Sequence, residues 1–253
     1  MQEGSPKASR GRRRLWYLLA GGLGVVVVGF LVIYFVVFPT SSPKPFTLGE
    51  TTRLAGTPSV ASGTSASGAT AAPLTGDWTI ASGSQAGYRV REKLAFLPAE
   101  SDAVGRTSQI KGSASFTTHG AATQITSASF TVNVYSLKSD RSMRDEKIRE
   151  IGLESARYPT STFSSSGDAA VPAGLAKGEI VKVTVAGVLQ LHGVSKHVTI
   201  PVEMRSTGAT LQAVGSITFP WGEFGMSAPS LGGFVNVTEH ATMEFELRLA
   251  RSS

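Results

Sequence analysis

The sequence predicts an all-β domain over residues 76–250, an antiparallel barrel or sandwich of about eight strands. Two observations predict this class. Apolar and polar residues alternate along one segment after another, which is the pattern of a strand with one buried and one solvated face. Runs of Gly, Ser and Pro separate these segments and leave little room for helix. A parallel α/β sheet is disfavoured, because its strands are continuously apolar.

The alternation is clearest in four segments: Phe130–Val134, Val181–Val185, Val198–Met204 and Met243–Leu249. Four weaker candidates complete the set: Trp78–Ile80, Gly87–Glu92, Ser113–Thr117 and Leu211–Phe219. The carboxylates of these strands, such as Glu244 and Glu246, stand between apolar residues. We therefore expect them on the solvated face of the sheet.

One charged stretch interrupts the alternation. Residues Asp140–Ser155 are rich in Arg, Glu and Lys, which favour a helix. Met143, Ile148 and Ile151 give this helix a narrow apolar side. The dipeptide Tyr158-Pro159 follows, and a residue before proline avoids helical backbone angles. The sequence thus predicts a short charged helix that lies across one mouth of a barrel.

The N-terminal part has a different composition. Leu15–Phe38 has 24 residues without a charge, about 36 Å of helix, which is enough to cross a bilayer core. This length favours an uncleaved transmembrane anchor over a signal peptide. The basic tail, residues 1–14, places the N-terminus in the cytoplasm. Residues 39–75 are rich in Pro, Ser, Thr, Gly and Ala, which predicts a disordered linker of roughly 35 Å root-mean-square span.

The charge and the reactive residues exclude several classes of function. The net charge is +6, but the first 14 residues carry +4, so the rest of the chain has no basic stripe for nucleic acid. The chain has no Cys, and its four His form no H-E-x-x-H pair. No nucleophile elbow or phosphate loop is found. We therefore expect no catalytic residue, no metal site and no cofactor, and we keep a cofactor-dependent enzyme as a third alternative.

The interior of the predicted barrel leaves two functions open. An eight-stranded barrel encloses a space that side chains fill or that holds one slender ligand. A dry apolar cavity would suit a lipid chain. A filled barrel would instead be a surface module that contacts proteins of the cell envelope. The volume of the cavity distinguishes these two hypotheses.

Five segments carry a further signal when they are read in order. The charged stretch contains Arg144-Asp145 and Tyr158-Pro159, and the others are "GSQAGYRVRE" at 83–92, "VGRT" at 104–107, "GVLQLHGVSKHVTIPV" at 187–202 and "FGMSAPSLGGFVNV" at 224–237. Together they resemble the YceI-like family over nearly all of residues 76–249. Residues 83–92 resemble the first long strand of the family in its actinobacterial form, and residues 104–107 the start of the next strand.

The resemblance implies a lipocalin-like antiparallel barrel that encloses a long isoprenoid, quinone-like or similar lipid, and it implies binding rather than catalysis. Arg144 and Asp145 match the Arg-Asp pair of the family, His192 matches its hairpin, and Tyr88 lies on the strand that leads into the pocket. The candidate ligand-binding residues are Tyr88, Phe130, Val132, Arg144, Asp145, His192 and Phe224.

Two departures from the family limit what the resemblance implies. Many members carry a His-Ser pair where this chain has residues 85–88, and a His soon after the Arg-Asp pair, where it has residues 146–148. The roles of those histidines do not transfer. Arg144 then has two interpretations. It pairs with Asp145 and locks the helix against the rim, or it donates hydrogen bonds to a phosphate or quinone head group.

These inferences combine into one leading hypothesis. The chain is a single-pass protein of a bacterial cytoplasmic membrane, with an extracytoplasmic barrel that binds a long-chain lipid. Its expected partners are the membrane, through Leu15–Phe38, the lipid and a protein of the cell envelope.

Overall fold

The computed structural model describes residues 42–48, 73–94, 100–120, 122–231 and 235–252. The tail and the membrane span predicted at 1–14 and 15–38 lie outside these residues, as does most of the predicted linker. None of the helices formed by the described residues combines the length and the apolar character that crossing a membrane requires. The sheet lies within the unit that runs from Pro43 to Ser253.

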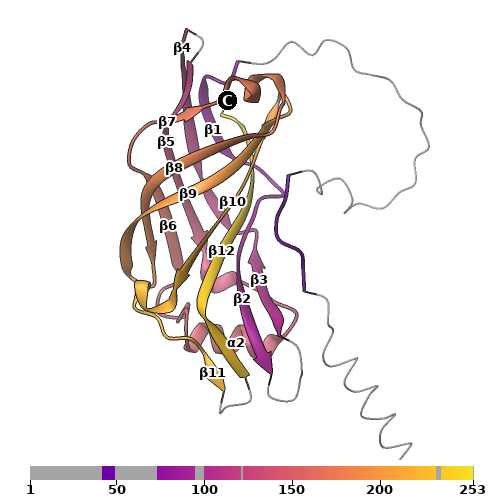
Figure 1. Ribbon diagram of the computed structural model, residues 1–253, viewed down its shortest axis with the longest axis vertical. Helices are drawn as coiled ribbons and strands as arrows, with labels where there is room; N and C mark the ends of the chain where they lie inside the picture. The colour runs from indigo at the N-terminus through magenta and orange to yellow at the C-terminus, as the bar shows by residue number, and fades with distance from the viewer. Residues whose placement is uncertain (1–41, 49–72, 95–99, 121, 232–234, 253) are drawn as a thin grey trace, which may run out of the picture. The chain divides into compact units, whose positions relative to one another are not determined.

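Eight antiparallel strands form a closed barrel, which Figure 1 shows from the side. The ring closes because β1 pairs with β12 on one side, Trp78 opposite Arg251, and with β4 on the other, Trp78 opposite Ala114. In the order of the ring the strands are β1 (Gly76–Ile80), β4 (Ile110–His119), β5 (Ala122–Asn133), β6 (Thr160–Ser165), β8 (Val181–Leu191), β9 (Val194–Ser206), β10 (Thr210–Pro220) and β12 (Val235–Arg251).

A hairpin extends the sheet beyond this ring. Strand β2 (Gln85–Leu94) pairs with β12, and β3 (Ser101–Thr107) pairs with β2. Two short strands lie beside the ring, β7 (Ala169–Val171) next to β5 and β11 (Ser230–Leu231) next to β12. Three 3-10 turns complete the described elements: η1 (Val134–Ser136), η2 (Ala173–Lys177) and η3 (Trp221–Phe224).

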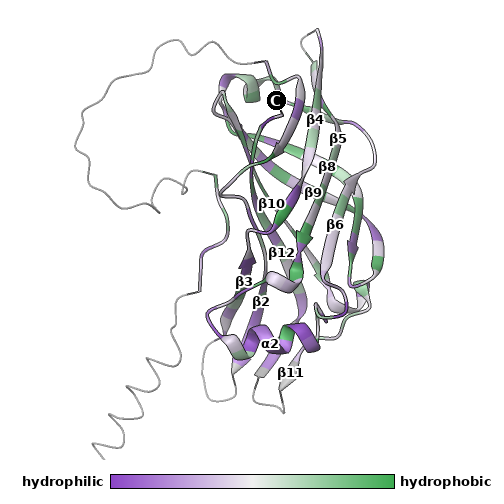
Figure 2. Cartoon of the chain, turned by 180° about the vertical axis from the view of Figure 1, so that it is seen from behind, coloured by the Kyte–Doolittle hydropathy of each residue, from purple (hydrophilic) through white to green (hydrophobic). Residues whose placement is uncertain are grey.

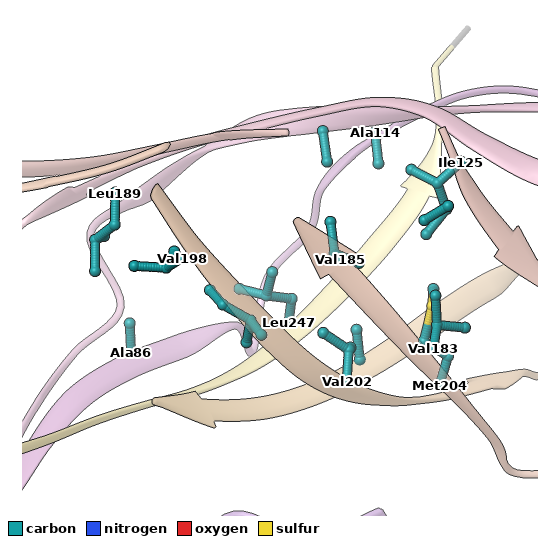
Figure 3. Close-up of a cluster of buried hydrophobic side chains, with 14 of the residues drawn as sticks. Ala86, Ala114, Ile125, Val183, Val185, Leu189, Val198, Val202, Met204 and Leu247 are labelled. Carbon is teal, nitrogen blue, oxygen red and sulfur yellow. The ribbon is translucent and has the colours of Figure 1, made fainter. Parts of the chain in front are cut away.

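The core lies inside the barrel, and the alternation of the sequence builds it. Along β8, buried and exposed positions alternate almost without interruption. Figure 3 shows Val183, Val185, Val202 and Leu247 among the side chains that meet in the interior. Each of the eight predicted segments lies within or largely within a strand, so the all-β prediction is confirmed.

Four strands were not predicted by the alternation: β3, β6, β7 and β11. The physical reason is clearest for β6, whose sequence TSTFSS has small hydroxyl residues on both faces. The "VGRT" segment, expected to start a strand, ends β3 instead. The prediction that Glu244 and Glu246 are solvated is wrong. Glu244 is only 4% exposed, because Arg89 and Arg106 cover its carboxylate.

The charged stretch does form a helix at one end of the barrel, α2 (Ser142–Glu150), which Figure 2 shows as mostly hydrophilic. It is shorter than predicted. It ends because Gly152 follows with a φ of +79°, a left-handed angle that commonly ends helices, so Pro159 is not what ends it. The predicted apolar side is also wrong, since Met143 is 69% exposed and α2 has no buried residue.

Two described parts of the predicted linker make contacts with the barrel. Leu74 is buried in the core, and its carbonyl oxygen accepts a hydrogen bond from the indole of Trp78 at 2.9 Å. Leu74 therefore belongs to the domain, two residues before its predicted start. Residues 43–46 contact the outer face of the sheet through Arg89 and Arg106.

Candidate ligand-binding site

An apolar cavity of about 130 Å³ lies inside the barrel. Its walls are almost wholly aliphatic and aromatic side chains from the strands of the ring, since these are the inward positions of the alternation. Phe130 and Val132 of β5 line it, as the sequence analysis proposed for ligand-binding residues. Ser161 and Thr162 of β6 also border it, with their hydroxyls bound to Gln190. The sequence did not indicate them, because β6 has no recognisable pattern.

A second cavity, of about 40 Å³, lies next to the first. The two are neighbours, because Ala86, Val132 and Met243 line both. Tyr88 lines the second cavity together with Trp221 and other apolar residues. The described residues therefore give the interior one continuous apolar lining.

The ring of Tyr88 packs over a glycine of the neighbouring strand, where a larger residue would clash with it. Gly105 is its partner across β2 and β3, and a Cβ atom there would lie 2.3 Å from the Cε1 atom of Tyr88. Burial raises the pKa of the Tyr88 phenol well above its ordinary value, and the charge of Arg144 only partly offsets this. The hydroxyl is close enough to Ser139 to be affected by it, but it forms no well-directed hydrogen bond within the described residues.

A network of charged side chains joins α2 to the end of β2. The guanidinium of Arg144 donates to the carboxylate of Glu92 at 2.7 Å and also to Asp140. Burial opposes the charge of Arg144, but Glu92 and Asp140 outweigh this and raise the pKa of its guanidinium. Asp145 instead accepts from the backbone amide and the hydroxyl of Ser139, at 2.8 and 2.7 Å.

The predicted pairing of Arg144 with Asp145 is therefore wrong. The two are adjacent on a helix and point to different partners, as neighbours along a helix do not face each other. Arg144 still fastens the helix to the barrel, but through Glu92, 52 residues away in the sequence. No local pattern marks Glu92 as its partner.

His192 joins three segments near the same mouth. Its Nδ1 atom lies 3.1 Å from the carbonyl oxygen of Phe224, so this nitrogen carries the hydrogen and donates it. Its Nε2 atom lies 3.3 Å from a carboxylate oxygen of Glu154, and the ring of Tyr158 is 4.4 Å away. Both His192 and Glu154 have left-handed backbone angles, with φ of +52° and +44°, a strained conformation for these residues.

The seven candidate residues thus separate into two groups. Tyr88, Phe130 and Val132 line the cavities. The other four do not line either cavity and lie in the contacts around the mouth: Arg144, Asp145, His192 and Phe224. The pairing of Glu92 with Arg144, and of Glu154 and Tyr158 with His192, could be found only from the geometry, since the partners are distant in the sequence.

Comparisons with known proteins agree with this architecture. The model of the YceI-like domain family matches residues 78–249. A polyisoprenoid binding domain from Saccharophagus degradans has 17% identity and a TM-score of 0.54, over 70% of this chain and 99% of its own. BcnA from Burkholderia cenocepacia has 23% identity and a TM-score of 0.48, over 64% of this chain and 95% of its own. No curated protein matches the chain.

Proposed function

Because the chain belongs to the YceI-like family, we propose that it binds a long-chain isoprenoid lipid, such as a polyisoprenoid or a quinone, inside its barrel. The observation that carries this proposal is the apolar cavity of about 130 Å³. Cavities of about 150 Å³ with apolar walls stay dry and bind small hydrocarbons. The Saccharophagus degradans domain, described as polyisoprenoid binding, has the same fold and supports the same class of ligand.

The size of the cavity constrains how such a ligand is held. Sites for drug-sized ligands usually have about 300–1,000 Å³. The two cavities here, about 130 and 40 Å³, are smaller. A long isoprenoid therefore needs the side chains between them to move apart, and Val132 and Met243, which line both, are the ones that would shift first.

The lining favours binding over catalysis. Among the described residues that border the larger cavity, Glu244 is the one that can ionise. Its carboxylate is on the outer face of β12, where Arg89 and Arg106 bind it at 3.1 and 3.0 Å. A general acid or base needs a proton-transfer group within reach of its substrate. The hydroxyls of Ser161 and Thr162 donate to Gln190 of β8, so they offer no free reactive group to the cavity.

We place the protein in a bacterial cytoplasmic membrane, in the anchored actinobacterial form of the family. The support is in the sequence: Leu15–Phe38 is long and uncharged, and Arg12–Arg14 directly precede it. The barrel then lies on the extracytoplasmic side. There it would take lipid from the bilayer or pass it to a partner in the cell envelope.

Native mass spectrometry of the full chain, released from its own membrane in detergent, tests the proposal. We expect an adduct of one lipid per chain that solvent extraction identifies as an isoprenoid. Ala114→Phe fills the cavity and should remove the adduct, with Ala128→Leu as a milder second variant. Ala170→Phe, at an exposed position of β7, is the matched control. An adduct-free wild type that stays free after incubation with membrane lipids would favour the alternative of a surface module.

A further inference from the structure

The segment Pro43–Phe46 lies against the outside of the barrel, beside β2 and β3 (Figure 1). The Nη2 atom of Arg89 donates to the carbonyl oxygen of Pro43 at 2.7 Å. The Nη2 atom of Arg106 donates to the carbonyl oxygen of Lys44 at 2.5 Å. The guanidinium of Arg106 also stacks 3.8 Å from the centre of the Phe46 ring.

The two arginines are held in place for these contacts. Glu244 accepts from both, and Asp102 accepts from Arg89 at 3.0 Å. A carboxylate that binds one edge of a planar guanidinium fixes its plane and leaves the remaining N–H groups pointing in a defined direction. Glu244 is on the outer face of β12 and is nevertheless buried. The contact between the two arginines and the segment is therefore part of the packed structure.

The composition of the segment fits this mode of binding. Its sequence is Pro-Lys-Pro-Phe, and two prolines favour an extended backbone and bring no N–H groups that need partners. Such a segment therefore binds a partner mainly through its carbonyl oxygens, which accept hydrogen bonds. The two arginines supply donors for two of these oxygens.

The direction of the segment along the barrel can be derived from the same contacts. Strand β2 runs toward the α2 end, because Glu92 near its end binds Arg144 of α2. Arg89 is nearer to that end than Gly87, which stands opposite Arg106. Pro43, bound by Arg89, is therefore closer to α2 than Phe46, bound by Arg106. From Phe46 to Pro43, the segment thus runs toward the α2 mouth.

We propose that Pro43–Phe46 is a strap that holds the barrel close to the membrane with its α2 mouth facing the lipid surface. This inference rests on the proposed membrane anchor. Five residue steps separate Phe38, the end of the predicted span, from Pro43, and they reach at most about 18 Å when extended. A free linker over residues 39–75 would instead let the barrel move over roughly 35 Å in any orientation.

The strap divides the linker into two parts with different roles, and this difference gives the test. The chain upstream of the strap sets the distance to the membrane, whereas the chain downstream of it only joins the strap to β1. We would insert 12 Gly/Ser residues, a segment that by itself spans roughly 19 Å root-mean-square, either between Thr40 and Ser41 or between Gly63 and Thr64. If the strap were not bound, the two insertions would lengthen the same tether equally.

Energy transfer to a dye in the head groups of nanodiscs reports the distance of the full-length chain from the bilayer. The chain has no Cys, so one label can be placed at Met143→Cys on α2 or at Ala209→Cys in the turn between β9 and β10. We expect stronger transfer from the α2 label. The upstream insertion should cause a severalfold loss of this transfer, and the downstream insertion should leave it unchanged. Phe46→Ala should make the downstream insertion reduce transfer as well.

Each other outcome overturns a stated part of the inference. Equal losses from the two insertions would show that the strap is not bound in the membrane. Equal transfer from the two labels would overturn the orientation of the α2 mouth. A chain that does not enter nanodiscs would overturn the anchor and with it the role of the strap. The readout does not depend on bound lipid, so a failure of lipid binding remains a separate result.

Discussion

The interior of the barrel and its α2 mouth are held together by different forces. In the interior, Trp78, Phe116 and Leu211 are fully or almost fully buried among other apolar side chains. At the mouth, Arg144 binds Glu92 and Asp140, and His192 contacts Phe224 and Glu154. Burial of apolar area is nondirectional, so many sequences with the same alternation would fill the interior. An ion pair out of water depends on the exact partner, so the mouth depends on particular residues.

This contrast predicts that the largest loss of stability follows a change in the interior. Trp78 is 0% exposed, and its ring packs edge-on against Phe116 where β1 closes the barrel. Trp78→Ala removes this packing and leaves a cavity, so we expect a loss of about 3–5 kcal/mol in the free energy of unfolding. Urea denaturation followed by circular dichroism measures it.

Trp221→Ala is the matched control for this change. It removes the same side chain from a half-buried position in η3, so the loss should be clearly smaller. Equal losses from the two variants would mean that closure through β1 does not determine the stability of the barrel.

A middle-sized effect is expected from breaking the ion pair at the mouth. Arg144 and Glu92 are 15% and 10% exposed, so removing one partner leaves the other charge poorly hydrated. We expect Arg144→Ala to cost about 2–3 kcal/mol, less than for a fully buried pair. The double variant Glu92→Gln/Arg144→Met should recover part of this loss, which a double-mutant cycle measures.

Lys147→Ala tests whether this effect belongs to the pair or to the helix. Lys147 and Glu150 form an exposed pair on α2, at 3.2 Å, and such a pair contributes under about 1 kcal/mol. If Arg144→Ala lowers lipid retention but leaves the unfolding free energy as in Lys147→Ala, Arg144 acts on a ligand head group and not on the fold.

The smallest effect concerns Tyr88 and depends on pH. Burial raises the pKa of its phenol above the ordinary value of about 10, so the folded chain keeps a proton that the unfolded chain loses. The contribution of Tyr88 to the free energy of unfolding is fully present below about pH 10. It is lost as the pH rises above this value, and the loss is about 1.4 kcal/mol at pH 11.

Denaturation at pH 8, 10 and 11 checks this expectation. Tyr88→Phe should flatten the alkaline decline in stability, and Tyr135→Phe, at an exposed position, is the control. An unchanged decline in Tyr88→Phe would contradict the assignment of this loss to the buried phenol.

The elements that follow from local patterns could be predicted, and those that follow from long-range contacts could not. The alternation of Val181–Val185 and Met243–Leu249 predicts β8 and the C-terminal half of β12, because each strand has one face in the interior. Strand β6 has no such pattern and is held by pairing with β5 and β8. The same reasoning holds at the site: Phe130 and Val132 line a cavity as proposed, whereas the partner of Arg144 is on a distant strand.

The sequence by itself determined the class of fold and the short charged helix, since these depend on periodicity and composition within each segment. Its eight predicted strands include β2, which is outside the barrel ring, and omit β6, which is part of it. It also carries the motifs of the YceI-like family. The tertiary structure alone decided that Glu92 holds Arg144, that Glu244 is buried between Arg89 and Arg106, and that residues 43–46 lie on the outer face of the sheet. The physical reason is distance along the chain: alternation acts between neighbours, whereas a buried charge is satisfied by whatever residue the fold brings to it.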